Sequence, residues 1–313
     1  MSAPSIGVDV GGSHVRTAVV SADGGLQHRR RLATPRGDGE AVVAAVVEAC
    51  SDYPPQLPLG IAVAGLITRD GEVLTSPNVG IAALALRRRV AEATGRDVVV
   101  ANDATLAALG EQRRGVGHGV DDLVLITVGT GVGGGIVIGG RPHDGATGFA
   151  GELGHLVVEV GGRRCACGRA GCLEAYASGT AIAAEARRRL SATASTSRLR
   201  EVAAPRTEDV LDAAEAGDRL ARDVLEDAGR WLGYAAAGVA NLLDPQLLVL
   251  GGGAGAAAHA WLLPPASEVL ATHLLGVPDR DPPGFVVAGL GDDAGVIGAA
   301  ILATEAFTGQ EPR

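Results

Sequence analysis

The chain has 313 residues, 47% of them hydrophobic and 3% aromatic, so it can form two domains whose cores are filled by small aliphatic side chains. Its formal net charge is −9, and all 27 basic residues are arginine because the sequence contains no lysine. The lack of lysine excludes a GxxxxGK-Ser/Thr phosphate loop and a lysine Schiff base. The acidic balance argues against a nucleic-acid-binding surface, and no apolar stretch is long enough to span a membrane, so we expect a cytoplasmic α/β protein.

The first predicted element is a β-hairpin in residues 5–20. The letters SIGVDVGGSHVRTAVV give an apolar strand, a glycine turn and a return strand. Asp9 ends the first strand just before Gly11, Gly12 and Ser13. A carboxylate here suits hydrated Mg²⁺, and glycine amides with a serine hydroxyl suit phosphate oxygens. The alternative is an aspartate that only tightens the turn.

Helical spacing predicts helices at residues 40–50 and 84–94, and the apolar run LGIAVAGLI predicts a buried strand at 59–67. The letters RDVVVANDATLAALGEQR then predict a strand, a loop and a helix, with Asn102 and Asp103 in the loop. Ligands of α/β sheets bind at the carboxyl ends of strands, so Asp103 is a candidate to accept a proton from a substrate hydroxyl. The alternative is that Asp103 only caps the helix.

A second predicted hairpin, in residues 121–140, repeats the design of the first about 115 residues later. This repetition suggests two related α/β lobes, each with a glycine turn that phosphate can approach. The turn contains GxGxxG from Gly129 to Gly134, but a strand follows it, where a dinucleotide site needs a helix. The letters LLVLGGGAG fit a dinucleotide site better and keep that alternative open. Both glycine stretches could also be plain turns.

A cluster of cysteines lies between residues 154 and 174, flanked by Glu152 and Glu174. Together with one histidine they give a Cys₃His set, which is typical of a closed structural zinc site. The residues of this set are His155, Cys165, Cys167 and Cys172. The alternative is a group of free thiols or a redox pair. Carboxylates that converge on one cleft suit a polyol, although each alone is typical of a surface acid.

The remaining predicted elements alternate between helices and one strand. They are a helix over 173–190, a short helix capped by Thr207 and ended by Gly217, a long helix from Asp218 to about Leu243, a strand over 246–253, a helix from near Gly255, and a closing helix over 292–307.

These motifs resemble the ROK family of sugar kinases and repressors, within the actin, sugar-kinase and Hsp70 superfamily. DVGGSH is similar to the family's DxGGTK phosphate turn, AND to its catalytic loop, and GTGVGGGI to its second phosphate turn. GELGH with CACGRAGCLE resembles the ROK signature, and LGGG with DDAGVIGAA the adenosine-side strand and the closing helix. The resemblance implies a two-lobed actin-like ATPase (ribonuclease H-like) fold, each lobe a mixed sheet flanked by helices, with a zinc-bound loop. The smaller lobe would take residues 1–115 and 295–313, and the larger lobe residues 116–294.

The resemblance also implies residue roles. Asp103 would be the general base. The residues that bind sugar hydroxyls would be Gly65, Asn78, Asn102, Asp103, Glu152, His155 and Glu174. The residues that line the nucleotide site would be Asp9, Gly11, Gly12, Ser13, His14, Thr130, Gly131, Gly252 and Gly253. One ring nitrogen of His155 would bind zinc while the other faces the sugar. Ser13 and His14 depart from the family's usual threonine and lysine or asparagine, which leaves their phosphate contacts open.

The expected activity is ATP-dependent phosphorylation of a hexose to its 6-phosphate, glucokinase-like, with Mg²⁺ and a structural Zn²⁺, in a homodimer or homotetramer. Polyphosphate is the alternative donor. Kinases of N-acetylhexosamine, fructose or allose, a non-catalytic sugar-binding or regulatory relative, and a dinucleotide-dependent oxidoreductase are the alternative functions. Repressor members carry an N-terminal helix-turn-helix, whereas the first strand here begins within about five residues of Met1.

Overall fold

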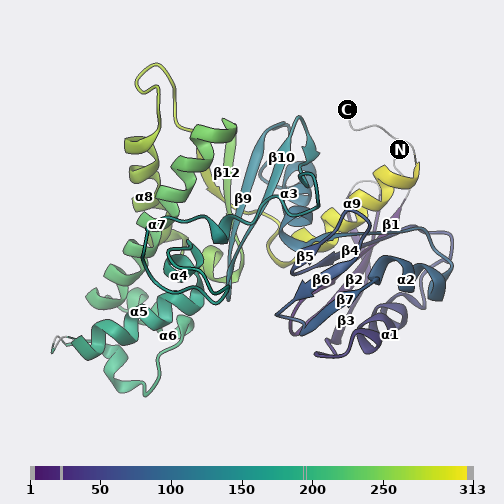
Figure 1. Cartoon of the computed structure of the whole chain (residues 1–313), viewed down its shortest axis with the longest axis horizontal. Coiled ribbons are helices and arrows are strands. Elements are labelled where there is room, and N and C mark those ends of the chain that lie inside the picture. The colour runs from purple at the N-terminus through teal and green to yellow at the C-terminus, as the bar shows by residue number, and fades with distance from the viewer. Residues whose placement is uncertain (1–3, 22–23, 193, 195, 309–313) are drawn as a thin grey trace. The chain divides into compact units, whose positions relative to one another are not determined.

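The structure is a computed structural model that describes residues 4–21, 24–192, 194 and 196–308 (Figure 1). The chain divides into two compact units. Unit 1 comprises Met1–Leu125, Gly135–Gly151 and Asp292–Arg313, and unit 2 comprises Ile126–Gly134 and Glu152–Gly291. In the part of the chain that the structure describes, no helix has the length and apolar character needed to cross a bilayer.

A mixed five-stranded sheet lies at the centre of unit 1. Its strands are β1 (Ser5–Val10), β2 (His14–Val20), β3 (Leu26–Ala33), β4 (Leu59–Val63) and β8 (Val98–Asn102). The order is β3-β2-β1-β4-β8, with β2 antiparallel to both of its neighbours and β4 parallel to both of its own. The predicted hairpin at residues 5–20 is therefore confirmed. Parallel pairing of β1, β4 and β8 brings the residues after these strands to one edge of the sheet.

Helices cover both faces of this sheet. They are α1 (Gly39–Cys50), α2 (Leu86–Thr94), α3 (Asp103–Arg114) and α9 (Ala294–Thr308). Buried side chains of α1 and α2 pack with Ile6, Val8 and Val10 of β1, whereas those of α3 and α9 pack with Ala62 of β4. Helix α9, yellow in Figure 1, lies so close to β4 that a Cβ on Gly60 would stand 1.8 Å from a carbonyl oxygen of α9.

A small antiparallel sheet follows β4 in the chain. Its strands are β5 (Leu66–Ile67), β6 (Val73–Ser76) and β7 (Ile81–Leu84), hydrogen-bonded in that order. The expected strand at residues 59–67 is thus divided into β4 and β5. The left-handed backbone of Gly65, with φ of +130°, makes the break between them, and a Cβ there would meet the carbonyl oxygen of Thr75 at 2.2 Å.

The second five-stranded sheet has the order β11-β10-β9-β12-β13. Its strands are β9 (Leu123–Val128), β10 (Val132–Ile138), β11 (Arg141–Pro142), β12 (Leu247–Gly251) and β13 (Gly284–Val287). Strands β9 and β10 contribute residues to both units, and β9 and β10 confirm the second predicted hairpin.

Helices make up most of the rest of unit 2. They are η1 (Leu153–His155), α4 (Glu174–Ala177), α5 (Gly179–Ala192), η2 (Arg198–Glu201), α6 (Thr207–Glu215), α7 (Arg219–Leu243) and α8 (Gly253–His273), and η3 (Gly291–Asp293) precedes α9. Helices α7 and α8 pack closely because glycines of α7 face the α8 backbone. A Cβ on Gly229, for example, would lie 2.5 Å from the carbonyl oxygen of Leu262. The long helix from Asp218 is confirmed, with Asp218 as its N-cap.

Two predictions about helix boundaries were wrong. The single helix over 173–190 is two helices, because Ser178 is extended and caps α5 through Ala181. Thr207 is not a cap: it is the first residue of α6, and its hydroxyl donates to the carbonyl oxygen of Gly179. Helix α8 begins at Gly253, in agreement with the predicted start near Gly255.

The two units differ from the predicted lobes in residues 116–125, 135–151 and 292–294, which belong to unit 1. Their contacts with α3 give the physical reason. The side chain of Gln112 donates to the carbonyl oxygen of Val120 at 2.8 Å, and β11 packs on α3. Residues 1–3 and 309–313, which the prediction placed in the smaller lobe, lie outside the described residues.

Candidate functional site

The first glycine turn, between β1 and β2, is held by backbone and threonine hydrogen bonds. The amide of Gly11 donates to the carbonyl oxygen of His14 at 3.0 Å. Thr34 donates from its hydroxyl to the carbonyl oxygen of Gly11 at 2.7 Å, and from its amide to that of Ser13 at 3.0 Å. The predicted nucleotide residues of unit 1 therefore form one fixed loop. His14 Nδ1 lies 3.0 Å from a guanidinium nitrogen of Arg31.

Asn78 and Gly65, on either side of β6 in the sequence, contact residues of the candidate site in unit 1. A Cβ on Gly12 would lie 2.9 Å from the carbonyl oxygen of Asn78, so the turn and Asn78 are in close contact. The carbonyl oxygen of Gly65 accepts a hydrogen bond from the side-chain amide of Asn102 at 3.0 Å. Within unit 1, the structure brings predicted sugar-binding and nucleotide-binding residues together.

Asn102, and not Asp103, caps helix α3. Its side-chain oxygen accepts from the amides of Ala104 at 2.9 Å and Thr105 at 3.1 Å. The alternative that Asp103 is the cap is therefore wrong. Asp103 is the first residue of α3, where its Oδ1 accepts from the amide of Ala104 at 2.9 Å. Burial raises the pKa of Asp103, and the amide of Ala104 opposes this rise.

Asp9 lies among other acids and one arginine. Arg16 is its cross-strand partner on β2, with a guanidinium nitrogen 3.7 Å from Asp9 Oδ2, and Arg16 also pairs with Asp292 at 3.1 Å. Burial raises the pKa of Asp9 to about 7; the charge of Asp103 adds to the rise and that of Arg16 opposes it. Such a carboxylate is poised to bind a cation, which removes the penalty of its charge.

The second glycine turn, between β9 and β10, is bound by the segment from Glu174 to Thr180. The carbonyl oxygen of Gly129 accepts from the amide of Gly179 at 2.8 Å, and that of Thr130 accepts from the hydroxyl of Thr180 at 2.8 Å. Glu174 Oε2 accepts from the amide of Val132 at 3.1 Å. These contacts fix the backbone around Thr130 and Gly131.

The Cys₃His set is assembled in unit 2. Ligand atoms of its four members lie within 4.8 Å of one another, and the members are His155, Cys165, Cys167 and Cys172. The sulfurs of Cys167 and Cys172 are 3.7 Å apart. Tetrahedral zinc with Zn–S bonds near 2.3 Å requires sulfurs about 3.8 Å apart, so the set fits this ion.

The orientation of His155 separates its two ring nitrogens. Nδ1 lies 3.9 Å from the sulfur of Cys165, and Nε2 lies 3.8 Å from a carboxylate oxygen of Glu152. The sulfur of Cys165 is also 3.5 Å from Glu174 Oε1. Burial raises the pKa of the Cys165 thiol to about 12, with Glu174 contributing to the rise. A metal ion would therefore displace a proton from this thiol.

Gly252 and Gly253 lie where β12 meets α8. Gly252 has φ of +77°, and a Cβ there would lie 2.4 Å from the carbonyl oxygen of Val128. Only glycine fits this close approach, and the first amides of α8 follow it directly. The predicted order of strand, glycines and helix is confirmed.

Sequence reasoning missed Arg16, Asp292 and the Glu174–Val132 contact. A signal for Arg16 existed in the hairpin, because a register centred on the turn places residues 9 and 16 opposite one another. The other two contacts join residues more than 40 positions apart, and no local pattern reports them.

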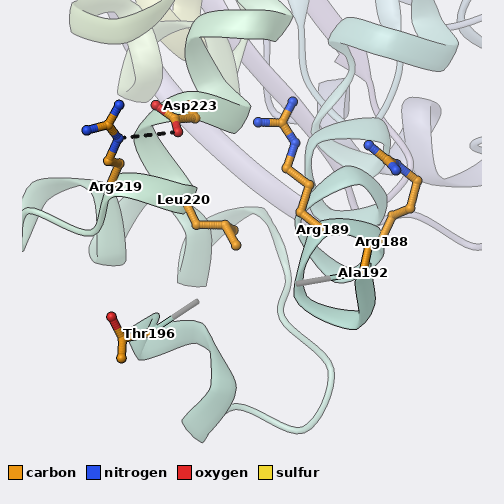
Figure 2. A pocket seen from close by; sticks show the side chains of 7 residues that line it. All are labelled: Arg188, Arg189, Ala192, Thr196, Arg219, Leu220 and Asp223. Carbon is orange, nitrogen blue, oxygen red and sulfur yellow. Dashed lines mark ion pairs between the residues drawn. The ribbon is translucent and has the colours of Figure 1, made fainter. Parts of the chain in front are cut away.

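A pocket of about 500 Å³ lies elsewhere in unit 2 and contains none of the predicted residues. Figure 2 shows its lining, which is Arg188, Arg189, Ala192, Thr196, Arg219, Leu220 and Asp223. Its charges are compensated, because Arg188 and Arg189 bind Glu185 and Arg219 pairs with Asp223. It is therefore a weaker candidate for phosphate than the glycine turns.

Comparisons with known proteins agree in the family they identify. The model of the ROK family matches residues 5–306. The chain is 35% identical to the glucokinase of Halalkalibacterium halodurans over 95% of this chain and 94% of that protein. It is 32% identical to the N-acetylmannosamine kinase of Escherichia coli over 96% of this chain and 98% of that protein. The crystal structure of a ROK family glucokinase from Streptomyces griseus in complex with glucose and AMPPNP is 36% identical, with a TM-score of 0.83, and the match covers 96% of this chain and 99% of that one.

Proposed function

Because this chain belongs to the ROK family, we propose that it is a sugar kinase that transfers the γ-phosphoryl group of ATP to a hexose hydroxyl, with glucose as its first candidate substrate. The observation that carries this proposal is the similarity over nearly the whole chain to a glucokinase solved with glucose and AMPPNP. N-acetylmannosamine is the second candidate, since a kinase named for that sugar is 32% identical.

Asp103 is the proposed general base. Its carboxylate is free of the capping role, which Asn102 performs, and burial raises its pKa and so makes it a stronger base. The sugar oxygen would form a bond to the γ-phosphorus while the bond to the bridging oxygen of ADP breaks. The proton of the sugar hydroxyl would pass to Asp103. In this chemistry positioning and electrostatics supply most of the rate enhancement.

The glycine turns are the proposed phosphate-binding elements. Backbone amides of the first turn, with Ser13, and those of the second turn, near Thr130 and Gly131, suit phosphate oxygens. Asp9 is the proposed carboxylate for Mg²⁺, which when bound with nucleotide neutralises phosphate charge. Gly252 and Gly253 are proposed to contact the nucleoside. The lack of lysine leaves these amides, the cation and arginines as sources of positive charge.

Sugar recognition is proposed to use carboxylate, imidazole and amide groups, which pair with neighbouring hydroxyls. The proposed residues are Gly65, Asn78, Glu152, His155 and Glu174, together with Asp103. Asn102 is proposed to act mainly by fixing Gly65 and capping α3, because both ends of its amide are already hydrogen-bonded.

The Cys₃His set is the proposed zinc site. Zn²⁺ there would supply structural support, with no part in the phosphoryl transfer. His155 would hold it through Nδ1, which leaves Nε2 toward Glu152 and the sugar. We further expect a cytoplasmic homodimer or homotetramer, which sedimentation analysis of the purified protein would test.

A coupled assay of ADP release tests the function. The assay would use zinc-loaded protein and either ATP or polyphosphate as the donor. The sugars tested as acceptors would be glucose, mannose, fructose, allose and N-acetylmannosamine. Asp103→Asn is expected to lower kcat for the best sugar by about 10²–10⁴-fold while its Kd for the sugar changes little. No turnover of any of these sugars would refute the proposal, and equal loss of binding and turnover in the variant would refute the base assignment.

A further inference from the structure

Three hydrogen bonds join the second glycine turn and the residue directly after it to one short segment of the chain, Glu174 to Thr180. Gly179 and Thr180 each bind a carbonyl oxygen of the turn, at 2.8 Å in both cases. Glu174 binds the amide of Val132, directly after the turn, at 3.1 Å. The turn therefore depends on where this segment lies.

The carboxylate of Glu174 contacts the turn with one oxygen and the cysteine cluster with the other. Oε2 fills the space beside Gly131, where a Cβ would come within 2.5 Å of it. Oε1 lies 3.5 Å from the sulfur of Cys165, one of the four members of the Cys₃His set. One side chain thus joins the metal cluster to the turn.

Helix α4, which carries Glu174, is joined through Tyr176 to the loop that leads to the cysteines. The hydroxyl of Tyr176 donates to Glu159 and accepts from the amide of Arg163 at 2.5 Å, and the Tyr176 ring packs on Trp231 with centroids 4.4 Å apart. Both Glu159 and Arg163 belong to the loop that leads to the cysteines. A shift of this loop would therefore move α4 and with it the carboxylate of Glu174.

We infer that Glu174 is a positioning residue for the second glycine turn, and that it couples occupancy of the Cys₃His set to nucleotide affinity. This role rests on the proposed function and adds to the proposed sugar contact of Glu174. A residue that only bound sugar would leave nucleotide binding in sugar-free protein unchanged. A residue that positions the turn would change it.

The first experiment measures the Kd of AMPPNP with Mg²⁺ by calorimetry in sugar-free, zinc-loaded protein. Glu174→Ala removes the bond to Val132, and Gly131→Ala displaces the carboxylate by its added Cβ. Each is expected to weaken AMPPNP binding by about tenfold, as the loss of one charge-assisted hydrogen bond predicts. Glu268→Gln, at an exposed position of α8, is the matched control and is expected to bind as the wild type does.

The second experiment tests the coupling. Zinc is removed by a chelator that is then dialysed away before Mg²⁺ is added, and zinc content is checked by elemental analysis. Zinc-free wild type is expected to lose AMPPNP affinity, whereas zinc removal in Glu174→Ala adds little further loss. Hydrogen exchange of the peptide that contains Val132 is expected to accelerate in both the variant and the zinc-free wild type.

The outcomes separate this inference from the proposed function. Folded variants and zinc-free protein that bind AMPPNP as tightly as the wild type, with unchanged exchange at Val132, would overturn the inference alone. A wild-type protein that binds no AMPPNP would refute the proposed function and this role with it. Circular dichroism melting of each variant identifies any variant that fails to fold. If one fails, hydrogen exchange of the peptide that contains Val132, measured in zinc-free wild type, decides whether the coupling exists.

Discussion

Asp9 is expected to lower the stability of the free protein at neutral and alkaline pH. Burial, and secondarily the charge of Asp103, raises its pKa from 3.8 to about 7. The shift of roughly three units corresponds to about 4 kcal/mol. The folded protein therefore binds more protons than the unfolded chain between these pKa values, so this contribution to stability falls as pH rises from about 4 to 7 and is fully lost above that range.

Replacing Asp9 with Asn removes the buried charge. The variant is expected to be more stable than the wild type by as much as about 4 kcal/mol at pH 8 and by about 2 kcal/mol at pH 5, where Asp9 is already largely protonated in the folded state. These values already include the pair with Arg16, 3.7 Å from Asp9, because the charge of Arg16 opposes the rise of the Asp9 pKa. Urea unfolding without Mg²⁺ at the two pH values measures both differences.

Asp281→Asn, at an exposed position, is the control and is expected to leave stability unchanged at both pH values. Mg²⁺ at pH 8 is expected to stabilise the wild type but not Asp9→Asn, because the cation relieves the same penalty. A gain in Asp9→Asn that did not depend on pH, or a loss of stability at pH 8, would show that burial does not destabilise the charged form of this side chain.

Three further predictions concern packing, a buried arginine and the metal cluster. Gly60→Ala is expected to destabilise the protein by about 3 kcal/mol, because the added Cβ meets the α9 backbone. Gly238→Ala has open space at its Cβ and is expected to stabilise the protein by up to about 1 kcal/mol. Thermal melts of the two variants measure both changes. Arg96→Met is expected to lower the free energy of unfolding, measured in urea, by about 3 kcal/mol, because the buried guanidinium donates to four carbonyl oxygens within residues 50–57. Arg96→Lys is expected to restore little of this stability. Zinc affinity, measured by competition with a chromophoric chelator, is expected to fall at least about tenfold from pH 8 to pH 6. The reason is that the pKa of the Cys165 thiol is raised, so the ion must displace its proton. Equal affinity at the two pH values would contradict a thiolate site.

Local sequence signals predicted the elements that position the candidate site. The glycine turns of both hairpins sit between apolar strands, and such turns are encoded within a few residues. The Cys₃His set was predicted for the same reason, since three of its members lie within eight residues. Patterns of this kind depend on residues close together in the sequence, so contacts elsewhere in the chain do not change them.

Long-range contacts decided the features that the sequence predicted wrongly. The break at Ser178 occurs where the next amide, that of Gly179, binds Gly129, some 50 residues earlier. The cap of α3 went to Asn102 because its amide also reaches Gly65. Local helix propensity and capping preference do not distinguish the alternatives at Ser178 or at the start of α3. Tertiary hydrogen bonds select between them.

The first glycine turn shows how a chain without lysine keeps positive charge near a proposed phosphate site. His14 occupies the position of the family's usual lysine or asparagine, and its Nδ1 lies 3.0 Å from a guanidinium nitrogen of Arg31. Arginine only donates hydrogen bonds, so His14 Nδ1 is the acceptor in this contact. The charge next to the turn comes from a guanidinium of β3, which a single-residue comparison at position 14 would overlook.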